Sequence, residues 1–97
     1  MIQSFDDPGT KDIFQTKNTK ASRKTLSAAL HAAAKRKLDQ IDFADAVKNL
    51  KIPPGNRLEA LSGDLNGYYS IRINVQWRIV FKWTDSGPEK VRICDYH

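Results

Sequence analysis

The sequence predicts an α+β fold in which an N-terminal strand and two to three helices pack on a small, mostly antiparallel twisted sheet. Two observations support this fold class. Apolar residues between positions 26 and 41 recur at steps of three and four, the spacing of one face of a helix. Beyond Pro53-Pro54-Gly55, short stretches are rich in β-branched and aromatic residues and alternate with polar ones, which is typical of strands. The order of the predicted elements, helices first and then a run of strands, is that of an α+β domain rather than of βαβ units.

The size and composition of the chain narrow the classes of protein that it can be. Ninety-seven residues fit one domain, spanning 1–97, and 40% hydrophobic with 28% charged residues is typical of a folded domain. There is no signal-like apolar segment and no 18-residue apolar run, and the single cysteine, Cys94, cannot form an internal disulfide. We therefore expect a cytoplasmic protein without a membrane partner, in which Cys94 is a small buried residue rather than a nucleophile.

The positive charge of the chain is concentrated at its N-terminal side. The formal net charge of +5 lies entirely within residues 1–37, whereas residues 38–97 carry eight charges of each sign. This asymmetry favours docking of a polyanion or of an acidic protein near the N-terminal segment, with a solvated helix face as the alternative. The candidate contact residues in this segment are Lys17, Lys20, Arg23, Lys24, Lys35, Arg36 and Lys37.

The N-terminal third begins with a short apolar stretch, residues 1–5, which predicts an opening strand. Turn residues at positions 7–9 then precede a brief predicted helix over residues 10–16. Residues 17–24 contain no acidic residue and are predicted as a basic loop.

The most strongly predicted helix covers residues 26–41, with an apolar stripe formed by Leu26, Leu30, Ala34, Leu38 and Ile41. Alanines fill much of the remainder and have high helix propensity. The stripe leaves a basic side for solvent.

His31 lies off this stripe and is predicted as a surface residue. No metal site is predicted around it, because no second ligand stands at a suitable spacing. A second short helix is predicted over residues 45–50 with Asp45 as its N-cap.

Four strands are predicted in the second half of the chain, and their alternation assigns each side chain to one of two faces. If the loop between the two central strands has two residues, 74–75, each face of the sheet carries both apolar core residues and charged residues. If it has three, 74–76, then Ile71 pairs with Ile79, and Arg72 stands opposite Arg78. We predict the odd-length loop. The predicted strands cover residues 57–61, 68–74, 77–83 and 91–96.

The polar face of this predicted sheet carries the candidate site. Two arginines directly across a strand pair repel each other, so an anion is expected to offset the cost, either a carboxylate or the phosphate of a partner. The predicted members of this face are Arg57, Glu59, Arg72, Arg78, Arg92 and Tyr96, with His97 at its margin.

These residue types suit the cleavage of RNA without a metal ion. That reaction needs a base for the 2′-OH proton, a cation for the charge that builds on phosphorus, and an acid for the leaving 5′ oxygen. Glu59, Arg78 and His97 are the candidates for base, phosphate clamp and acid, and Tyr96 for a hydrogen bond to phosphate or stacking on a base. The alternatives are a structural ion pair of Glu59 with a neighbouring arginine and a frayed C-terminal histidine.

Three stretches of the chain resemble the HigB branch of the RelE-like toxins, and the likeness extends over essentially the whole chain. These stretches are PPGNRLEALSGDLNGYYSIRIN, VQWRIVF and the final DYH. The resemblance implies the RelE-like microbial RNase fold and an endoribonuclease that cuts messenger RNA in the ribosomal decoding site without a cofactor. The arginine of QWRI corresponds to Arg78, and the closing pair to Tyr96 and His97. The position of Glu59 matches a catalytic histidine in some HigB-like members and a glutamate base in the YoeB branch.

One position departs from the family pattern. Many relatives have LKGD where this chain has LSGD, so Ser62 replaces a lysine that contributes to RNA binding or catalysis. Cleavage is then expected to be weaker, or Arg57 or Arg72 takes over the role of that lysine.

The resemblance also implies partners. It suggests ribosomal RNA contacts for the N-terminal basic residues, and a HigA-like helix-turn-helix antitoxin that silences the toxin and links it to operator DNA. The rival readings are a ParE-like toxin directed at DNA gyrase, which lacks the terminal DYH, and a non-catalytic RNA- or protein-binding module of the same fold.

Overall fold

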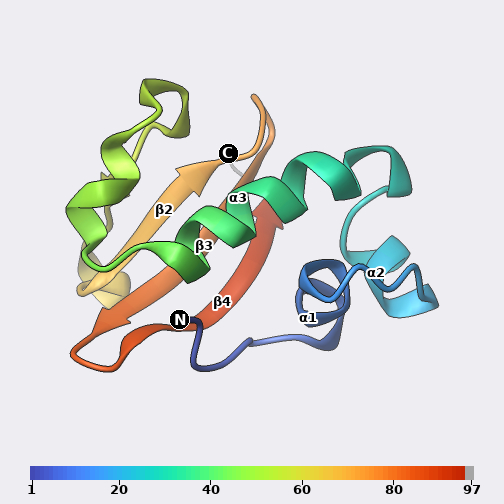
Figure 1. Cartoon of the computed structure of the whole chain (residues 1–97), viewed down its shortest axis with the longest axis horizontal. Helices are drawn as coiled ribbons and strands as arrows, with labels where there is room; N and C mark the ends of the chain where they lie inside the picture. The colour runs from blue at the N-terminus through green and yellow to red at the C-terminus, as the bar shows by residue number, and fades with distance from the viewer. Residues whose placement is uncertain (96–97) are drawn as a thin grey trace.

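The computed structural model describes residues 1–95 and contains one four-stranded sheet in the order β1-β2-β3-β4 (Figure 1). Every neighbouring pair of strands is antiparallel. This order places each strand beside the one that precedes it in the chain, so short connections suffice. The strands are β1 (Glu59–Ala60), β2 (Tyr68–Arg72), β3 (Trp77–Thr84) and β4 (Gly87–Asp95).

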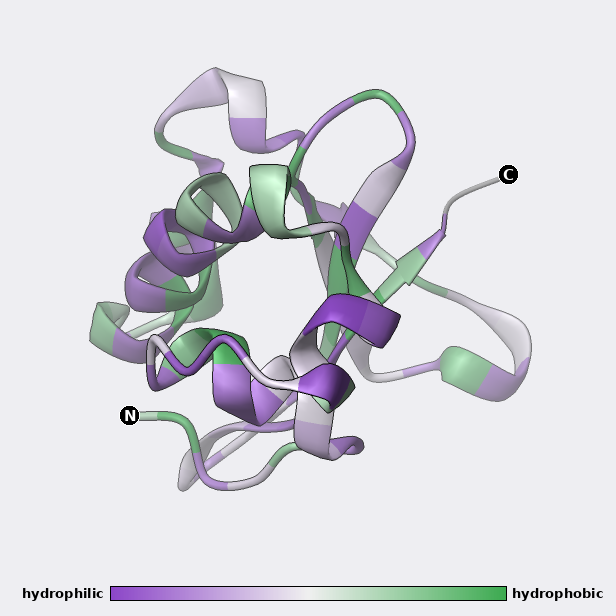
Figure 2. Ribbon diagram, turned by 90° about the vertical axis from the view of Figure 1, so that its right-hand side faces the viewer, coloured by the Kyte–Doolittle hydropathy of each residue, from purple (hydrophilic) through white to green (hydrophobic). Residues whose placement is uncertain are grey.

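The helices precede the sheet in the chain, which confirms the α+β prediction. Figure 1 shows α3 lying across one face of the sheet, with α1 and α2 beside it, and Figure 2 shows α3 and the sheet as two layers. The α-helices are α1 (Pro8–Phe14), α2 (Lys20–Thr25) and α3 (His31–Phe43). Short 3-10 helices are η1 (Ala28–Leu30), η2 (Val47–Lys51), η3 (Pro54–Asn56) and η4 (Gly63–Leu65).

The core lies between these two layers. From the helical side it receives the predicted stripe residues Leu26, Ala34, Leu38 and Ile41, all of which are buried. From the sheet it receives the inward side chains of the three longer strands. Burial of these apolar surfaces is the main force that holds the layers together. The buried sheet residues include Ile71, Ile79, Phe81, Val91 and Ile93.

The predicted loop over residues 17–24 is wrong, because α2 occupies residues 20–25. Its start is fixed by a capping box: the Thr19 side chain accepts a hydrogen bond from the Ser22 backbone N–H, and the Ser22 hydroxyl accepts one from the Thr19 backbone N–H. These two bonds satisfy backbone donors that a short helix otherwise leaves open. A basic composition is therefore compatible with a helix here.

The close contact between α1 and α2 depends on Gly9. A Cβ atom at this position would lie 1.9 Å from Thr25 Oγ1 and 2.6 Å from the Ala21 carbonyl oxygen. These separations are far below van der Waals contact, so only glycine permits the crossing. Thr10, the next residue, is fully buried, and its hydroxyl oxygen accepts a hydrogen bond from Ile93 N at 3.1 Å. The two residues anchor the helical layer to α2 and β4.

Several other element boundaries differ from the predictions. The predicted strand over residues 57–61 is reduced to Glu59–Ala60 because Arg57 has a left-handed backbone, the last strand begins at Gly87 rather than at 91, and α1 covers Pro8–Phe14 rather than 10–16.

The long helix begins at His31 rather than at residue 26, because Leu26 has an extended backbone at the end of α2. Residues 1–5 form no regular strand but run beside β4 through a single parallel bridge from Phe5 to Val91. Residues 47–51 form a 3-10 turn with Ala46 at its N-cap position, so Asp45 is not the cap. Little room remains before Pro53 for an α-helix.

None of the helices in residues 1–95 is long and apolar enough to cross a membrane.

Candidate functional site

The register of the β2–β3 hairpin sets the two faces of the sheet. Ile71 pairs with Ile79, and Arg72 with Arg78, as the three-residue loop predicts. The Asn74 side chain stabilises this loop, since its Oδ1 atom accepts hydrogen bonds from the backbone of Gln76 at 2.9 Å and of Trp77 at 2.8 Å. The odd-length loop is therefore confirmed, and the isoleucines face the core while the arginines face away from it.

Directly paired residues share a side of the sheet, so the polar face can be followed row by row. One row runs from Glu59 through Ser70 and Val80 to Arg92. The next row holds Arg72, Arg78 and Cys94. This face is opposite to the one that α3 covers.

A recess of about 230 Å³ opens on this face. Its lining includes three guanidinium groups and one carboxylate, which leaves a formal charge of +2. Such a surplus of positive charge in a small concave site favours an anion. The recess is lined by Arg57, Glu59, Arg72, Asn74, Val75 and Arg78.

Arg78 is the most buried of the charged residues in the recess, with 4% of its surface exposed. Its Nε atom donates to Ser70 Oγ at 2.9 Å, and its Nη2 atom donates to the Arg57 carbonyl at 2.6 Å and to the Ser70 carbonyl at 3.3 Å. Glu59 Oε1 lies 3.9 Å from the same Nη2 atom. Hydrogen bonds to these neutral oxygens orient the guanidinium, and the Glu59 carboxylate lies at the edge of ion-pair distance from it.

The carbonyl of Arg57 reaches Arg78 because of an unusual backbone conformation. Arg57 has φ 47 and ψ 55, in the left-handed region. The preceding residue, Asn56, is fully buried, and its side-chain amide donates to Gln40 Oε1 at 2.8 Å and to the Leu50 carbonyl at 3.2 Å. Lys37 donates to Asn56 Oδ1. The PPGNR segment therefore ties the edge of the recess to α3.

The two arginines that stand opposite each other direct their guanidinium groups to different oxygens. Arg72 Nε donates to the Asn74 carbonyl at 3.0 Å, within the hairpin loop, whereas Arg78 turns toward Ser70 and Arg57. Hydrogen bonds to carbonyl dipoles offset part of their repulsion. The predicted juxtaposition is confirmed, and the offsetting groups are mostly backbone oxygens.

Cys94 lies beside Arg78 in the same row and is half-buried. Burial raises the pKa of its thiol, while the neighbouring Arg92 and Arg78 cations lower it in part. The thiol is thus the favoured form near neutral pH, which agrees with a small packed residue rather than a reactive thiolate. Arg92 shares the face but does not line the recess.

The predictions for Tyr96 and His97 lie outside the described residues. The last described residue, Asp95, pairs with Trp77, one position away from the pair formed by Arg78 and Cys94.

The N-terminal basic residues occupy the helical side of the molecule and do not join the recess. Lys35 forms an ion pair with Asp39 at 2.7 Å, and its Nζ atom lies 4.5 Å from the centre of the Phe14 ring. The pKa of Lys37 is lowered by burial and by the neighbouring Arg36 cation. Arg23 donates to the Asn18 side chain and carbonyl and is exposed. The other exposed basic residues of this set are Lys17, Lys20, Lys24 and Arg36.

Two residues that hold Arg78 were not recognised in the sequence, Ser70 and Asn56. Alternation placed Ser70 on the polar face but gave no sign of its contact with Arg78. In the sequence, Asn56 stands out only as part of a segment rich in turn residues. Its position after Pro-Pro-Gly was the one available signal that a residue with a left-handed backbone lies nearby.

Comparisons with a family model and with known proteins point to the same family. A family model described as "RelE-like toxin of type II toxin-antitoxin system HigB" matches residues 3–97. Toxin HigB-1 of Vibrio cholerae serotype O1 is 47% identical over 60 residues, which are 62% of this chain and 63% of that protein, so the match spans less than two thirds of it. Endoribonuclease HigB of Proteus vulgaris is 30% identical over 97 residues, the full length of both chains.

The fold has solved counterparts. A YoeB-YefM complex from Staphylococcus aureus contains a chain that aligns with a TM-score of 0.61 and 21% identity, over 100% of this chain and 98% of that chain. At this level of identity the likeness establishes the RelE-like fold.

Proposed function

The chain belongs to the HigB-like toxins, the RelE-like toxins of type II toxin–antitoxin systems, and we propose that it is an endoribonuclease that cleaves messenger RNA in the decoding site of the ribosome and so inhibits translation. The observation that carries the proposal is the buried Arg78 guanidinium, oriented by hydrogen bonds to Ser70 and to the Arg57 carbonyl, with the Glu59 carboxylate 3.9 Å away in a positively charged recess. The name of the Proteus vulgaris relative supports the activity.

In the proposed reaction, the 2′ oxygen of the RNA attacks the adjacent phosphorus, and the bond from phosphorus to the 5′ oxygen breaks. Glu59 accepts the proton of the 2′-OH, and His97 donates a proton to the leaving 5′ oxygen. The products are a 2′,3′-cyclic phosphate and a 5′-hydroxyl end, so protons and charges balance without a metal ion. Tyr96 donates a hydrogen bond to the phosphate or stacks on a base.

Arg78 stabilises the negative charge that develops on the phosphate oxygens. A donor that is already fixed in place needs no reorganisation during the reaction, which is the main source of electrostatic catalysis. The hydrogen bonds from Arg78 to Ser70 and to the Arg57 carbonyl supply that fixation.

The remaining cations of the polar face bind the RNA backbone. Arg57 and Arg72, which line the recess, bind the phosphates on either side of the scissile bond in this proposal, and Arg92 extends the positive surface along the same face. These two recess arginines take the role of the lysine that Ser62 replaces. Lys20 and Lys24 on α2 are exposed and contact ribosomal RNA.

The regulatory partner in this proposal is a HigA-like helix-turn-helix antitoxin. Family membership supports a partner of this kind, and the structural counterpart from Staphylococcus aureus was solved as a toxin–antitoxin complex. Through the antitoxin, the complex binds operator DNA and represses its own operon.

The proposal is tested by brief expression of the chain in a bacterium, followed by mapping of new 5′ ends in the messenger RNA. We expect cuts confined to translated regions, and at least ~10²-fold fewer of them with Glu59→Gln, which removes a general base. Growth arrest with DNA damage and intact messages would contradict the proposal and indicate a gyrase-directed toxin.

A further inference from the structure

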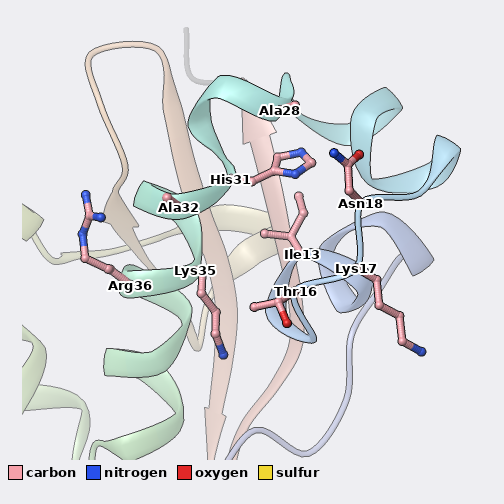
Figure 3. Close-up of a pocket in the computed structure, with 9 residues that line it drawn as sticks. All are labelled: Ile13, Thr16, Lys17, Asn18, Ala28, His31, Ala32, Lys35 and Arg36. Atoms are coloured by element: carbon pink, nitrogen blue, oxygen red, sulfur yellow. The ribbon is translucent and has the colours of Figure 1, made fainter.

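A second concave site lies on the helical side of the molecule. It has a volume of about 550 Å³ and opens between the C-terminal end of α1, the segment that follows it, and the first turns of α3 (Figure 3). It is separate from the catalytic recess, which lies on the opposite face of the sheet. Its lining residues are Ile13, Thr16, Lys17, Asn18, Ala28, His31, Ala32, Lys35 and Arg36.

The floor of this helical-side pocket is aliphatic. Ile13 from α1, Ala28 from η1 and Ala32 from α3 supply small apolar surfaces. The nearby aromatic ring, that of Phe14, is covered by the Lys35 ammonium group at 4.5 Å. The floor of the pocket therefore fits an aliphatic side chain better than a nucleobase, since no aromatic ring forms part of it.

The rim of the pocket is positively charged. Lys35 is neutralised by its ion pair with Asp39 at 2.7 Å. Lys17 and Arg36, which Figure 3 shows on opposite sides of the opening, are exposed, and their side chains make no hydrogen bond or ion pair with any residue between 1 and 95. No aspartate or glutamate is among the lining residues. Two unneutralised cations thus flank an apolar floor.

The polar groups between these cations have a fixed arrangement. His31 Nε2 bonds to the Leu26 carbonyl at 2.7 Å, which orients the imidazole ring at the mouth of the pocket. Asn18 accepts a hydrogen bond from Arg23 at 2.8 Å through its Oδ1 atom. Since both side chains are held by neighbours, this part of the pocket is shaped before any partner arrives, which lowers the entropic cost of binding.

We propose that the helical-side pocket binds an acidic segment of the antitoxin protein, which inserts an aliphatic side chain against Ala28 and Ala32 and places carboxylates beside Lys17 and Arg36. The charge of the rim and the apolar floor together match such a segment. Recognition of single-stranded RNA usually uses aromatic side chains for stacking, and His31, whose ring is held by the Leu26 carbonyl, is the one aromatic residue that lines the pocket. The partner in this inference rests on the proposed function, but the location of the contact rests on the pocket itself.

The experiment measures binding of the HigA-like antitoxin encoded beside the toxin to purified variants of the full chain, by isothermal titration calorimetry. The double substitution Lys17→Glu with Arg36→Glu is expected to weaken binding at least ~10-fold, the scale of removing close charge pairs from an interface. The matched control is Lys48→Glu with Lys51→Glu, which makes the same change in net charge at two exposed lysines of η2 away from the pocket. The control should stay within ~3-fold of the unchanged chain.

A second pair of variants tests the apolar floor without any change of charge. Ala32→Gln fills the pocket from α3, whereas Ala29→Gln adds the same side chain at an exposed position of η1 that does not line it. The first should weaken antitoxin binding at least ~10-fold through steric exclusion, and the second should not. Thermal unfolding of all four variants checks that each is folded.

The outcomes separate this inference from the proposed function. Failure of the unchanged chain to bind the antitoxin would overturn the inference and the regulatory partner in the proposed function, whereas the mapping of 5′ ends tests the nuclease activity separately. Equal binding by the pocket variants and their controls would overturn the inference alone. A pocket variant that loses RNA cleavage but keeps antitoxin binding would identify RNA as the occupant. A pocket variant that loses a self-associated form in sedimentation would identify a second copy of the chain as the occupant. Either result would also overturn the inference.

Discussion

The two positively charged sites of this molecule differ in how their charges are held. In the recess on the polar face, Arg78 is 4% exposed and donates to Ser70 and to the Arg57 carbonyl. In the helical-side pocket, Lys17 and Arg36 are exposed, and their side chains have no hydrogen bond or ion pair within the described chain. A buried and oriented cation suits stabilisation of a transition state, whereas exposed cations around an apolar floor suit recognition. Charge alone would not have distinguished the two.

The largest expected effect comes from removing His97. Deletion of this terminal residue should lower the rate of messenger RNA cleavage by at least ~10²-fold, because the leaving 5′ oxygen loses its acid. Binding of the antitoxin should be unaffected, since the proposed docking surface does not include this residue. The rate is measured on ribosomes with a defined message. A fully active truncated chain would reject the assignment of His97.

A smaller effect is expected from Ser70→Ala. The hydroxyl of Ser70 accepts the Arg78 Nε hydrogen bond at 2.9 Å, so its loss leaves the guanidinium less well oriented. We expect a decrease in kcat of roughly 10-fold with little change in KM, the scale of one or two hydrogen-bond contributions. If Ser70 acts only through Arg78, the substitution should have no further effect in an Arg78→Ala background. Additive losses in the double variant would show an independent role.

The next prediction concerns stability on the helical side. Gly9→Ala should lower the free energy of unfolding by about 2 kcal/mol or more, because the new methyl group overlaps Thr25 and the Ala21 carbonyl. The matched control is Gly55→Ala, where a Cβ atom meets nothing within 4 Å. Chemical denaturation measures both. Equal stability of the two variants would contradict the close packing of α1 on α2.

The smallest effect concerns Cys94. Because burial raises the pKa of its thiol, a smaller fraction is thiolate at pH 8 than in a free cysteine. Alkylation by iodoacetamide should therefore be several-fold slower than that of a small free thiol such as glutathione, and it should speed up as the pH rises toward the raised pKa. Faster alkylation than the free thiol would indicate an activated cysteine and contradict this account of the row that it shares with Arg78.

Much of the recess could be predicted from alternation along the strands. The odd-length hairpin loop places Arg72 and Arg78 opposite each other and away from the core, and the strand before it adds Glu59 to the same side. A period of two leaves only two faces, and the apolar residues decide which one is buried. Wherever a strand is regular, the sequence therefore determines which face of the sheet each side chain occupies.

The remaining features depend on contacts that no local pattern encodes. The left-handed backbone of Arg57 is held by Asn56, whose partners come from α3 and η2. The start of α2 depends on a Thr19-Ser22 pair, a weaker signal than the common form with glutamate or glutamine. The helical-side pocket arises where α1 meets α3, so only the packing of the two helices reveals it.

The central claim is that Arg78 is held in the recess to stabilise the charge on a phosphodiester. It is tested most directly by the single-turnover rate of messenger RNA cleavage on ribosomes with Arg78→Ala, compared with Lys82→Ala, which removes a charge from the same face of β3 outside the recess. We predict a loss of at least ~10²-fold for Arg78→Ala, as for removal of a preorganised donor, and less than ~3-fold for Lys82→Ala. Cleavage by a folded Arg78→Ala variant at a rate similar to that of the unchanged chain would contradict the claim.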